Sequence, residues 1–434
     1  MSNDDCTPAR SIEDLRVAAL GAGTDPAGIP WAELAPDRLR GERTSLKWTR
    51  FDSDVLPMFV AEMDFAVAPE IRRAIVARVE ASDTGYLDSP GPLAPAFADF
   101  ARDRWGWEVD PRSVQLAADV SCGVVEPLRL VVPPTGGRVA VTTPVYPGFF
   151  EMLSELPVEV VQVPLAVSAD EREGGAHAAG SQPGAASPIH ARLDLDALER
   201  EFAAGLDALV LSNPHNPHGL LHTAEELRAL ARLAAEHGVF VLSDEVHAPL
   251  THQGRAFVPF APIAAEAGAL SVTATSASKG WNLAGVKCSV IVAADERASR
   301  LLRRLPAEVT TRASILGLHA SVAAFREGRD WIDRAIAQTE ANLRLFVALA
   351  AERLPGVRIA EPAAGYLAWV DLQDTGLGDD PARRILREGR VAFNNGRAFG
   401  LGGEGHARVN LACAPDTIVD ATDRIAAILP GVRA

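Results

Sequence analysis

A lysine that follows a run of small hydroxyl residues is the feature of this sequence most suited to covalent chemistry. Lys279 closes the stretch Thr-Ala-Thr-Ser-Ala-Ser-Lys, which continues a strand-like segment that begins at Leu270. Small neighbours leave space for a bulky group beside the amine, and the hydroxyls can donate hydrogen bonds to an anion. An amine held in a partly apolar pocket has a lowered pKa and can attack a carbonyl carbon. The alternative is a lysine that ends a strand with its ammonium group in water.

Two other polar segments also follow predicted strands. Asn216 lies in Ser-Asn-Pro-His-Asn-Pro-His-Gly, residues 212–219, where two Asn-Pro steps fix a tight loop. Asp244 and His247 lie in Ser-Asp-Glu-Val-His, directly after the next predicted strand. The carboxyl ends of strands in a doubly wound sheet line the crevice where ligands bind. A carboxylate in that crevice can pair with a protonated ring nitrogen.

The elements that must position these residues alternate between strand and helix from about residue 110 to 295. Seven apolar, β-branched segments are predicted as strands: Val114–Ala118, Arg138–Thr142, Val158–Val163, Ala208–Ser212, Val239–Ser243, Leu270–Thr275 and Val286–Ala293. Helices are predicted at 124–132 and at 223–237, where Thr223 and Glu226 form a capping-box pattern. This alternation predicts an α/β fold with a mostly parallel, seven-stranded sheet covered by helices.

The rest of the sequence predicts a second, smaller α+β domain. A long helical region, interrupted near Gly328, runs through Trp331–Leu354, and short strands are predicted at 357–360, 366–372 and 407–412. The predicted organisation is a loosely ordered extension at 1–40, a segment at 41–84 that contributes to the small domain and the site, a large domain at 85–325 with a flexible insertion at 168–190, and a small domain at 326–434.

Composition and charge narrow the classes of function. The 434 residues carry a formal net charge of −15, which would repel phosphate backbones, so we expect no nucleic-acid partner. No apolar run approaches the roughly 20 residues of a membrane span, and no signal-peptide pattern opens the sequence. We therefore expect a cytoplasmic protein that is not embedded in a membrane. The cysteines, Cys6, Cys122, Cys288 and Cys413, are far apart, which argues against a disulfide framework or a structural zinc site.

Two further patterns are interpreted as structural. His215, His218 and His222 straddle a proline and a glycine, so they cannot share one helix face as a zinc site prefers, and no metal site is predicted. Gly-Leu-Gly-Gly-Glu-Gly at 400–405 matches a dinucleotide-binding pattern, but a strand rather than a helix is expected after it. This stretch is therefore predicted to be a flexible loop.

The segments around Asn216, Asp244 and Lys279, in this order, resemble the fold-type I pyridoxal-phosphate enzymes of the class I and II aminotransferase family, over about residues 43–426. By that resemblance the cofactor is pyridoxal 5′-phosphate, and Lys279 forms the internal aldimine. Asp244 keeps the pyridine nitrogen protonated, and a protonated ring is the electron sink that stabilises a carbanion at the substrate Cα. Asn216 donates a hydrogen bond to the phenolic oxygen of the ring, and His247 lies near that oxygen.

The resemblance also implies where the cofactor phosphate is held. The residues implied are the start of a helix, a hydroxyl near the lysine and one cation: Cys122, Gly123, Val124, Ser276 and Lys287. Free amides at a helix N-terminus bind phosphate, and Lys287 presents a point charge where many relatives have an arginine fork. Gly85-Tyr86 resembles the segment that reaches the phosphate of a neighbouring subunit, so a homodimer with shared active sites is expected.

The substrate contacts are implied by three further segments. Tyr146, in Pro-Val-Tyr-Pro, resembles the residue that stacks on the cofactor ring and faces the substrate. Arg408, in Ala-Arg-Val-Asn-Leu, resembles the arginine that grips the α-carboxylate of an amino-acid substrate. A two-pronged contact with Arg408 would orient the Cα–H bond for proton removal by the freed Lys279. Asp64, in Met-Asp-Phe, completes the predicted substrate contacts.

A set of motifs is similar to the cystathionine β-lyase subgroup, the C–S lyases. The set comprises Lys47-Trp48 and residues 56–65, 212–219, 243–247, 365–371 and 399–405. Departures from the subgroup pattern are Gly148, His218 in place of a threonine, and Glu62 in place of an aspartate. The resemblance implies a C–S β-lyase that cleaves cystathionine or another cysteine S-conjugate to a thiol, pyruvate and ammonia. An aminotransferase and a non-catalytic regulatory protein of the same fold are the alternatives.

Overall fold

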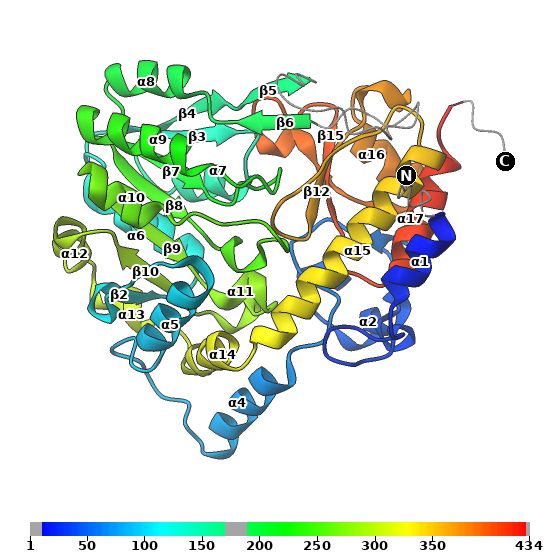
Figure 1. Cartoon of the computed structure of the whole chain (residues 1–434), viewed down its shortest axis with the longest axis horizontal. Coiled ribbons are helices and arrows are strands. Elements are labelled where there is room, and N and C mark those ends of the chain that lie inside the picture. The colour runs from blue at the N-terminus through cyan, green and yellow to red at the C-terminus, as the bar shows by residue number, and fades with distance from the viewer. Residues whose placement is uncertain (1–10, 170–188, 431–434) are drawn as a thin grey trace, which may run out of the picture.

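A seven-stranded sheet forms the centre of the larger part of the molecule (Figure 1). The computed structural model describes residues 11–169 and 189–430. The strands, in their order across the sheet, are β2 (Val114–Ala117), β10 (Ser289–Ala293), β9 (Ser271–Thr275), β8 (Phe240–Asp244), β7 (Ala208–Ser212), β3 (Gly137–Thr143) and β4 (Val158–Pro164). Six of these strands run in the same direction, and β10 runs in the opposite direction. The predicted mostly parallel, seven-stranded sheet is confirmed.

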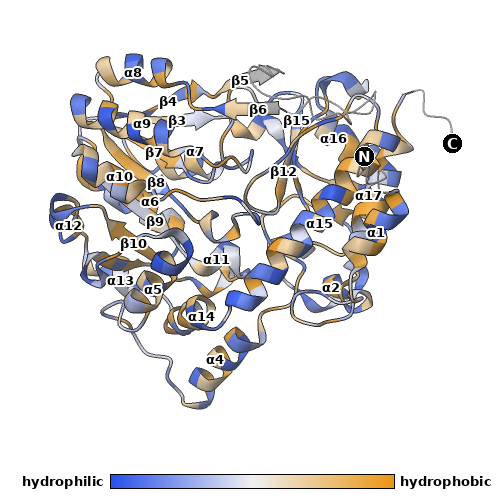
Figure 2. Cartoon of the chain, viewed as in Figure 1, coloured by the Kyte–Doolittle hydropathy of each residue, from blue (hydrophilic) through white to orange (hydrophobic). Residues whose placement is uncertain are grey.

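Helices cover both faces of this sheet because its central strands are buried on both sides. Every residue of β7, β8 and β9 is buried, as is typical of parallel strands. The helices that pack on one face are α6 (Val120–Val131), α7 (Gly148–Leu153) and α12 (Glu296–Leu302). The helices on the other face are α8 (Leu195–Ala203), α9 (Ala224–His237) and α10 (Phe260–Ala267). Figure 2 shows hydrophobic strands between helices of mixed hydropathy, as burial of one helix face requires.

An aromatic core packs against β2 and β10, the two strands at one end of the seven-stranded sheet. The helices around it are α4 (Pro69–Glu80), α5 (Leu93–Trp105), α11 (Ala277–Gly280) and α14 (Ile315–Arg326). Val309 of α13 (Ala307–Thr311) packs instead in the core beside α6 and α12. Phe97, Phe100, Trp281 and Phe325 are buried in the aromatic core, and the ring centroids of Phe100 and Phe325 lie 5.1 Å apart. This core fixes α11, the helix that carries Lys279.

A second, four-stranded sheet forms the smaller part of the molecule. Its order is β11 (Arg358–Ala360), β12 (Leu367–Asp371), β15 (His406–Asn410) and β14 (Asn394–Asn395). The 25-residue helix α15 (Arg329–Arg353) runs from the larger part to this one and packs on α1 (Ile12–Leu20) and α17 (Pro415–Ala426) (Figure 1). The short strand β1 (Leu56–Pro57) pairs in parallel with β13 (Val391–Ala392). The N-terminal segment thus joins the smaller part before it reaches the larger one.

The N-terminal extension, expected to be loosely ordered and to firm up near Trp31 or Leu39, contains regular structure from Ile12 onward. Residues 11–40 contain α1, a 3₁₀ turn at Trp31–Leu34 and most of α2 (Pro36–Glu42). The side chain of Ser11 caps α1, and Ile12 packs against the core of the smaller part. Packing against α15 and α17 therefore stabilises a helix whose own sequence pattern is weak. Residues 1–10 lie outside the described residues.

Three other boundaries differ from the expectation or lie outside the structure. Helix α6 begins at Val120 rather than at 124, because Asp119 caps it. Strand β10 begins at Ser289, three residues later than expected. Residues 170–188 of the insertion expected at 168–190 lie outside the described residues. On either side of them, β5 (Ala166–Ala169) pairs with β6 (Ile189–Arg192).

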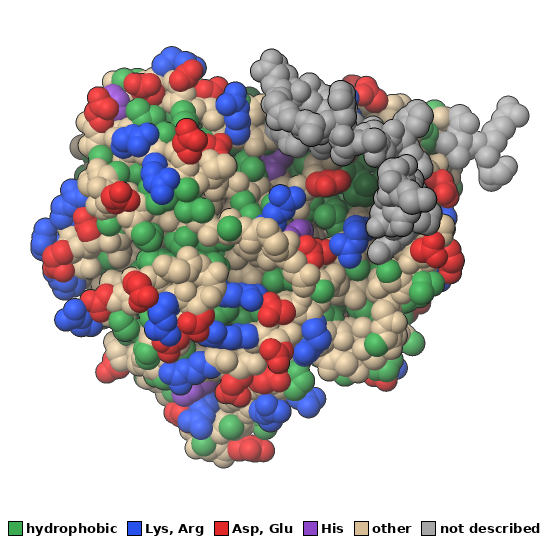
Figure 3. All heavy atoms as spheres, in the orientation of Figure 1, with side chains coloured by type: hydrophobic (Ala, Val, Ile, Leu, Met, Phe, Trp, Pro, Cys, Tyr) green, Lys and Arg blue, Asp and Glu red, His purple; other side chains and the backbone are tan. Residues whose placement is uncertain are grey.

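Acidic and basic side chains are interspersed over the face shown in Figure 3, so the net charge of −15 is not gathered into one patch there.

Among the helices of residues 11–169 and 189–430, none is long and apolar enough to cross a bilayer.

Candidate active site

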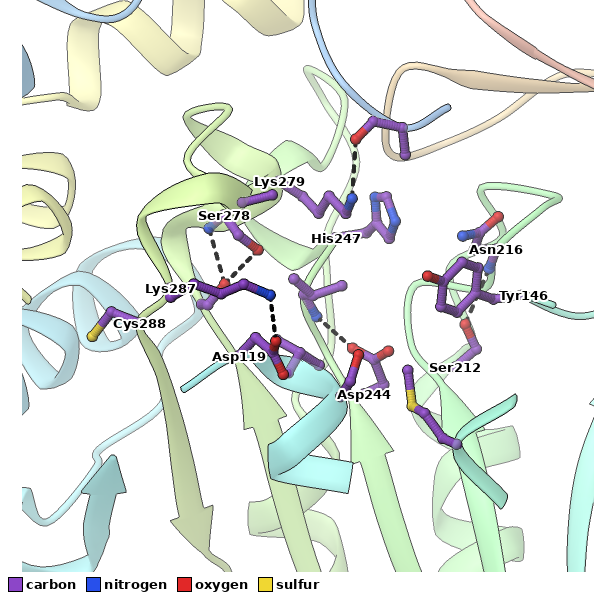
Figure 4. A pocket seen from close by; sticks show the side chains of 17 residues that line it. Asp119, Tyr146, Ser212, Asn216, Asp244, His247, Ser278, Lys279, Lys287 and Cys288 are labelled. Atoms are coloured by element: carbon purple, nitrogen blue, oxygen red, sulfur yellow. Dashed lines mark hydrogen bonds and ion pairs between the residues drawn. The ribbon is translucent and has the colours of Figure 1, made fainter. Parts of the chain in front are cut away.

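A cavity of about 170 Å³ lies at the carboxyl ends of β7, β8 and β9. Its walls come from these strand ends, from the first turn of α6 and from Ala61 in the N-terminal segment. Figure 4 shows Lys279, Asp244, Asn216 and Tyr146 around it. Parallel strands place their carboxyl ends at one edge of the sheet, which is why separate motifs meet here.

Lys279 lies on the short helix α11, four residues after the end of β9. Its Nζ donates a hydrogen bond to the carbonyl oxygen of Ala61 at 3.0 Å. Burial lowers the pKa of Lys279 to about 8, and the nearby Arg408 contributes to this lowering. A neutral amine is therefore accessible near neutral pH, as a nucleophile or a base requires.

Asp244 and His247 lie at the end of β8 and just after it. The Asp244 carboxylate is buried, accepts a hydrogen bond from the amide of Val246 at 3.1 Å and faces the cavity (Figure 4). Burial raises the pKa of Asp244 to about 6. Burial lowers the pKa of His247 to about 3, and Lys279 and Arg408 act in the same direction. At neutral pH the site therefore contains a buried carboxylate beside a neutral imidazole.

Arg408, in β15, is a buried cation without a carboxylate partner among the described residues. Its side chain is 2% exposed, and burial lowers the pKa to about 10. Nη1 donates to Asn216 Oδ1 at 2.9 Å, and Nη2 donates to the carbonyl oxygen of Phe59 at 3.3 Å. Nε is buried and has no partner. Because Oδ1 of Asn216 already accepts from Arg408, the amide nitrogen of Asn216 remains free to donate into the cavity.

Tyr146 lines the same cavity, and a glycine makes its position possible. The ring packs edge-on against Phe149, with ring centroids 5.7 Å apart. A Cβ atom at Gly148 would lie 2.4 Å from the ring of Tyr146. The departure at Gly148 noted in the sequence therefore has a structural reason: only glycine lets the ring lie this close to the backbone.

The other end of the cavity is rich in hydroxyl groups and contains one ion pair. Ser276 caps α11 with its side chain, and its Oγ contacts Ser278 Oγ at 2.5 Å. Lys287 Nζ donates to Asp119 Oδ2 at 2.7 Å, and Ser121 lies in the first turn of α6. All five residues line the cavity, and Figure 4 shows Lys287 and Asp119 together at this end.

The structure places Cys122, Gly123 and Val124 beside the cavity but not among the residues that line it. Val124 is fully buried in the core, and Gly123 packs against Ala274 and Ile291. Because α6 begins at Val120 and not at the predicted residue 124, these positions lie within the helix rather than around its first residue. The lining residues of this turn are Asp119, Val120 and Ser121. A contact between residues 122–124 and a phosphate remains a prediction.

Asp64 and Tyr86 do not line the cavity either. Asp64 is 3% exposed and forms an ion pair with the buried Lys47, which also donates to the carbonyl oxygen of Glu62 at 3.0 Å. Burial raises the pKa of Asp64, with the Lys47 ammonium acting against this shift. Asp64 thus pairs with Lys47, and its contact with a substrate remains a prediction. Tyr86 is 95% exposed, and its contact with a second subunit remains a prediction.

Two of the three neighbouring histidines are held by backbone groups. The Nε2 atoms of His215 and His222 contact the carbonyl oxygens of Thr142 and Ser212 at 3.0 and 3.1 Å. Burial lowers the pKa of His218 to about 3. In the described part of the chain, no group of three or more His, Cys, Asp or Glu side chains is arranged to hold a metal ion.

Sequence reasoning missed several residues that line the cavity. Asp119 could have been found, because an aspartate before an apolar helix is a typical N-cap. Ala61 lies in a motif that was noted, yet its contribution is a carbonyl oxygen, which no residue type reveals. Ser278 lies next to Lys279, and its small size does not by itself indicate that its hydroxyl lines the cavity.

Comparisons with known proteins agree with this geometry. The model of the family "Aminotransferase class I and II" matches residues 53–425. The cystathionine β-lyase of Corynebacterium glutamicum is 34% identical, over 91% of this chain and 98% of the relative. The cystathionine β-lyase PatB of Bacillus subtilis is 32% identical, over 89% of this chain and 96% of the relative.

A solved structure shows the same fold. It is a protein from Corynebacterium diphtheriae, provisionally described as a PLP-dependent β-cystathionase, with a TM-score of 0.79 and 32% identity. The match covers 89% of this chain and 96% of that one. The match to the family model over most of the chain and the identities above 30% lead to one conclusion. This chain belongs to the class I and II aminotransferase family.

Proposed function

We propose that this protein is a pyridoxal-phosphate-dependent C–S β-lyase that cleaves cystathionine or another cysteine S-conjugate to a thiol, pyruvate and ammonia. The observation that carries the proposal is the buried guanidinium of Arg408, which has no carboxylate partner among the described residues and lies near the Lys279 amine. Two relatives named cystathionine β-lyases, similar over 91% and 89% of the chain, support this choice of reaction.

The residues around the cavity fit the cofactor. Asp244 supplies a buried anion for a protonated ring nitrogen, and the free amide nitrogen of Asn216 can donate to a ring oxygen. Gly148 leaves room for the ring of Tyr146 at the cavity wall. Residues that can bind a phosphate lie at the opposite end: Ser121, Ser276, Ser278 and Lys287.

The protein then has to orient the substrate and move one proton. When bound, the cofactor supplies an electron sink for the electron pair left at the substrate Cα. Arg408 binds the α-carboxylate with its guanidinium fork, which fixes the direction of the Cα–H bond. Lys279, whose pKa is about 8, can accept that proton as a neutral amine. The buried His247 stays neutral and adds no competing charge.

Cleavage of the C–S bond follows from loss of the proton. The electron pair of the Cα–H bond forms a double bond between Cα and Cβ, and the Cβ–S bond breaks with its electrons on sulfur. The thiolate leaves, and addition of water converts the remaining three-carbon fragment to pyruvate and ammonia. No external oxidant or reductant is needed.

One assay tests the proposal against the aminotransferase alternative. The protein loaded with pyridoxal 5′-phosphate is incubated with L-cystathionine and no keto acid. We expect pyruvate and thiol over many turnovers, and neither product from Lys279→Ala. Conversion of the bound cofactor without pyruvate would contradict the lyase proposal and favour an aminotransferase. Binding of the cofactor without turnover of either kind would favour the non-catalytic alternative.

A further inference from the structure

The phosphate end of the cavity contains a carboxylate where an anion has to bind. Asp119 lines the cavity together with Ser121, Ser276, Ser278 and Lys287. Its Oδ1 accepts the amide of Cys122 at 2.8 Å, which caps α6. Its Oδ2 accepts Lys287 Nζ at 2.7 Å. One side chain therefore binds one of the first amides of the helix and also the cation, and both kinds of group attract a phosphate.

The charge balance at this end is unfavourable for a phosphate. Lys279 and Lys287 are the two Lys or Arg side chains among the described residues that line the cavity, and Lys279 lies at the reactive centre. Lys287 is thus the cation available to the phosphate, and Asp119 already neutralises it. Burial acts to raise the pKa of Asp119, but hydrogen bonds from Lys287 and the Cys122 amide outweigh it and lower the pKa, so the carboxylate stays ionised.

The helix cap itself does not require this charge. Ser, Thr and Asn cap helices about as well as Asp, and each is neutral. A neutral cap would still accept the Cys122 amide, but it would carry no charge to neutralise the Lys287 ammonium or to repel the phosphate. Asp119 therefore adds repulsion at a position where the fold needs only a hydrogen-bond acceptor.

We propose that Asp119 sets the affinity for the cofactor by acting against its phosphate group. The carboxylate competes with the phosphate for Lys287, and it repels the phosphate dianion. The cofactor is consequently held less tightly at its phosphate than the fold allows. This inference rests on the proposed function only in that pyridoxal 5′-phosphate is taken as the cofactor.

The test compares two ligands that differ only in the phosphate. Cofactor-free wild-type protein, Asp119→Asn and Asp119→Ser are titrated with pyridoxal 5′-phosphate and with pyridoxal, and the visible absorbance of the lysine-bound ligand is followed. Both substitutions keep a side chain that caps the helix, and both remove the charge of Asp119. We expect each to tighten pyridoxal 5′-phosphate binding about tenfold, equal to ~1.4 kcal/mol, and to change pyridoxal binding less than about twofold. The gain should shrink as salt is added, because the charges are partly exposed.

A matched control is available on the surface. Asp295 also caps a helix, accepting the Ala298 amide at 2.8 Å, and also binds a neighbouring cation, Arg297, at 2.8 Å. It does not line the cavity, so Asp295→Asn should leave both affinities unchanged.

Three results would overturn the inference. The neutral variants could bind pyridoxal 5′-phosphate no better than wild type, they could bind it more weakly, or they could bind both ligands more tightly by the same factor. Weaker binding would show that Asp119 positions Lys287 for the phosphate. Failure of wild-type protein to bind pyridoxal 5′-phosphate at Lys279 would instead contradict the proposed function, so the two failures are distinguishable.

Discussion

Lys47 and Arg408 are both buried cations, 1% and 2% exposed, and both bind carbonyl oxygens of the segment at residues 59–62. Lys47 has a carboxylate partner, Asp64, within hydrogen-bond distance. Arg408 has amide and carbonyl oxygens as acceptors, and its Nε has no partner within residues 11–169 and 189–430. A buried charge normally requires a counter-ion. The paired cation therefore completes the fold, whereas the unpaired one awaits an anionic ligand.

The segment between these cations connects them with the reactive lysine. Ala61 accepts the hydrogen bond of Lys279, and the carbonyl and amide groups of Met63 bind the side chain of Asn282 at 2.9 Å each. Lys47 thus holds the segment in place. Arg408 and Lys279 donate hydrogen bonds to carbonyl oxygens of the same segment. Burial alone therefore does not identify a functional cation. The groups that the cation binds identify it.

The largest effect is expected when the paired cation is removed. Lys47→Met leaves the Asp64 carboxylate buried without a counter-ion, which should lower the free energy of unfolding by about 3–5 kcal/mol. Denaturant titration measures this loss. The double variant Lys47→Met/Asp64→Leu should recover most of the stability, because it removes both charges. If Lys47→Met unfolds at the wild-type denaturant concentration, the pair contributes little and the comparison fails.

Removal of the unpaired cation should lower activity rather than stability. Arg408→Met should lower kcat/KM at least about a hundredfold, equal to ~2.7 kcal/mol, and should leave the stability unchanged or higher, because an unpaired buried charge is gone. Steady-state kinetics and denaturant titration on the same sample measure both. Arg16, which binds Asp416 at the surface, is the matched control, and Arg16→Met should change neither quantity. Loss of stability with normal kinetics would assign Arg408 a structural role.

The pH dependence of cofactor attachment links Arg408 to Lys279. A neutral amine is the nucleophile, so the rate should rise about tenfold per pH unit below the pKa of Lys279. It should level off above about pH 8. Arg408 contributes to the lowering of that pKa, so the midpoint should move to higher pH in Arg408→Met. Rapid-mixing absorbance measures the rate. A midpoint near that of an ordinary lysine in wild-type protein would show that the amine is not held in an apolar site.

A smaller effect is expected at the cavity wall. Gly148→Ala puts a methyl group 2.4 Å from the ring of Tyr146, so the ring must move. We expect about a fivefold loss of kcat/KM, or ~1 kcal/mol. Gly41→Ala is the control, because no atom lies within 4 Å of the added methyl group. Equal kinetics for the two variants would mean that the ring position does not matter for turnover.

Much of the fold could be predicted because its signals are local. The apolar, β-branched runs at β7, β8 and β9 are buried on both faces, so each strand is visible in the sequence without its neighbours. Asn216, Asp244 and Lys279 could be placed in one crevice because parallel strands share an edge. The helix at 224–237 was visible from its capping box at Thr223.

The remaining features depend on contacts between distant segments. Lys287 meets Asp119 across 168 positions, and no local pattern connects them. Helix α1 has a cap at Ser11 in its own sequence, but its packing against α15 joins segments that are far apart in the sequence. Asp64 lies in the Met-Asp-Phe motif, which does not by itself reveal a buried ion pair. Its partner Lys47 belonged to the same set of motifs, and two buried opposite charges in one set were the available signal for a structural pair.

The most direct test of the central claim measures whether Arg408 recognises a carboxylate. S-methyl-L-cysteine and its amide differ in that one charge, and kcat/KM for the two is compared in wild-type protein and in Arg408→Met. We predict that wild type prefers the acid at least about a hundredfold, and that the variant prefers it less than about threefold. The same preference in both proteins would contradict the assignment of Arg408 as the cation that binds the substrate.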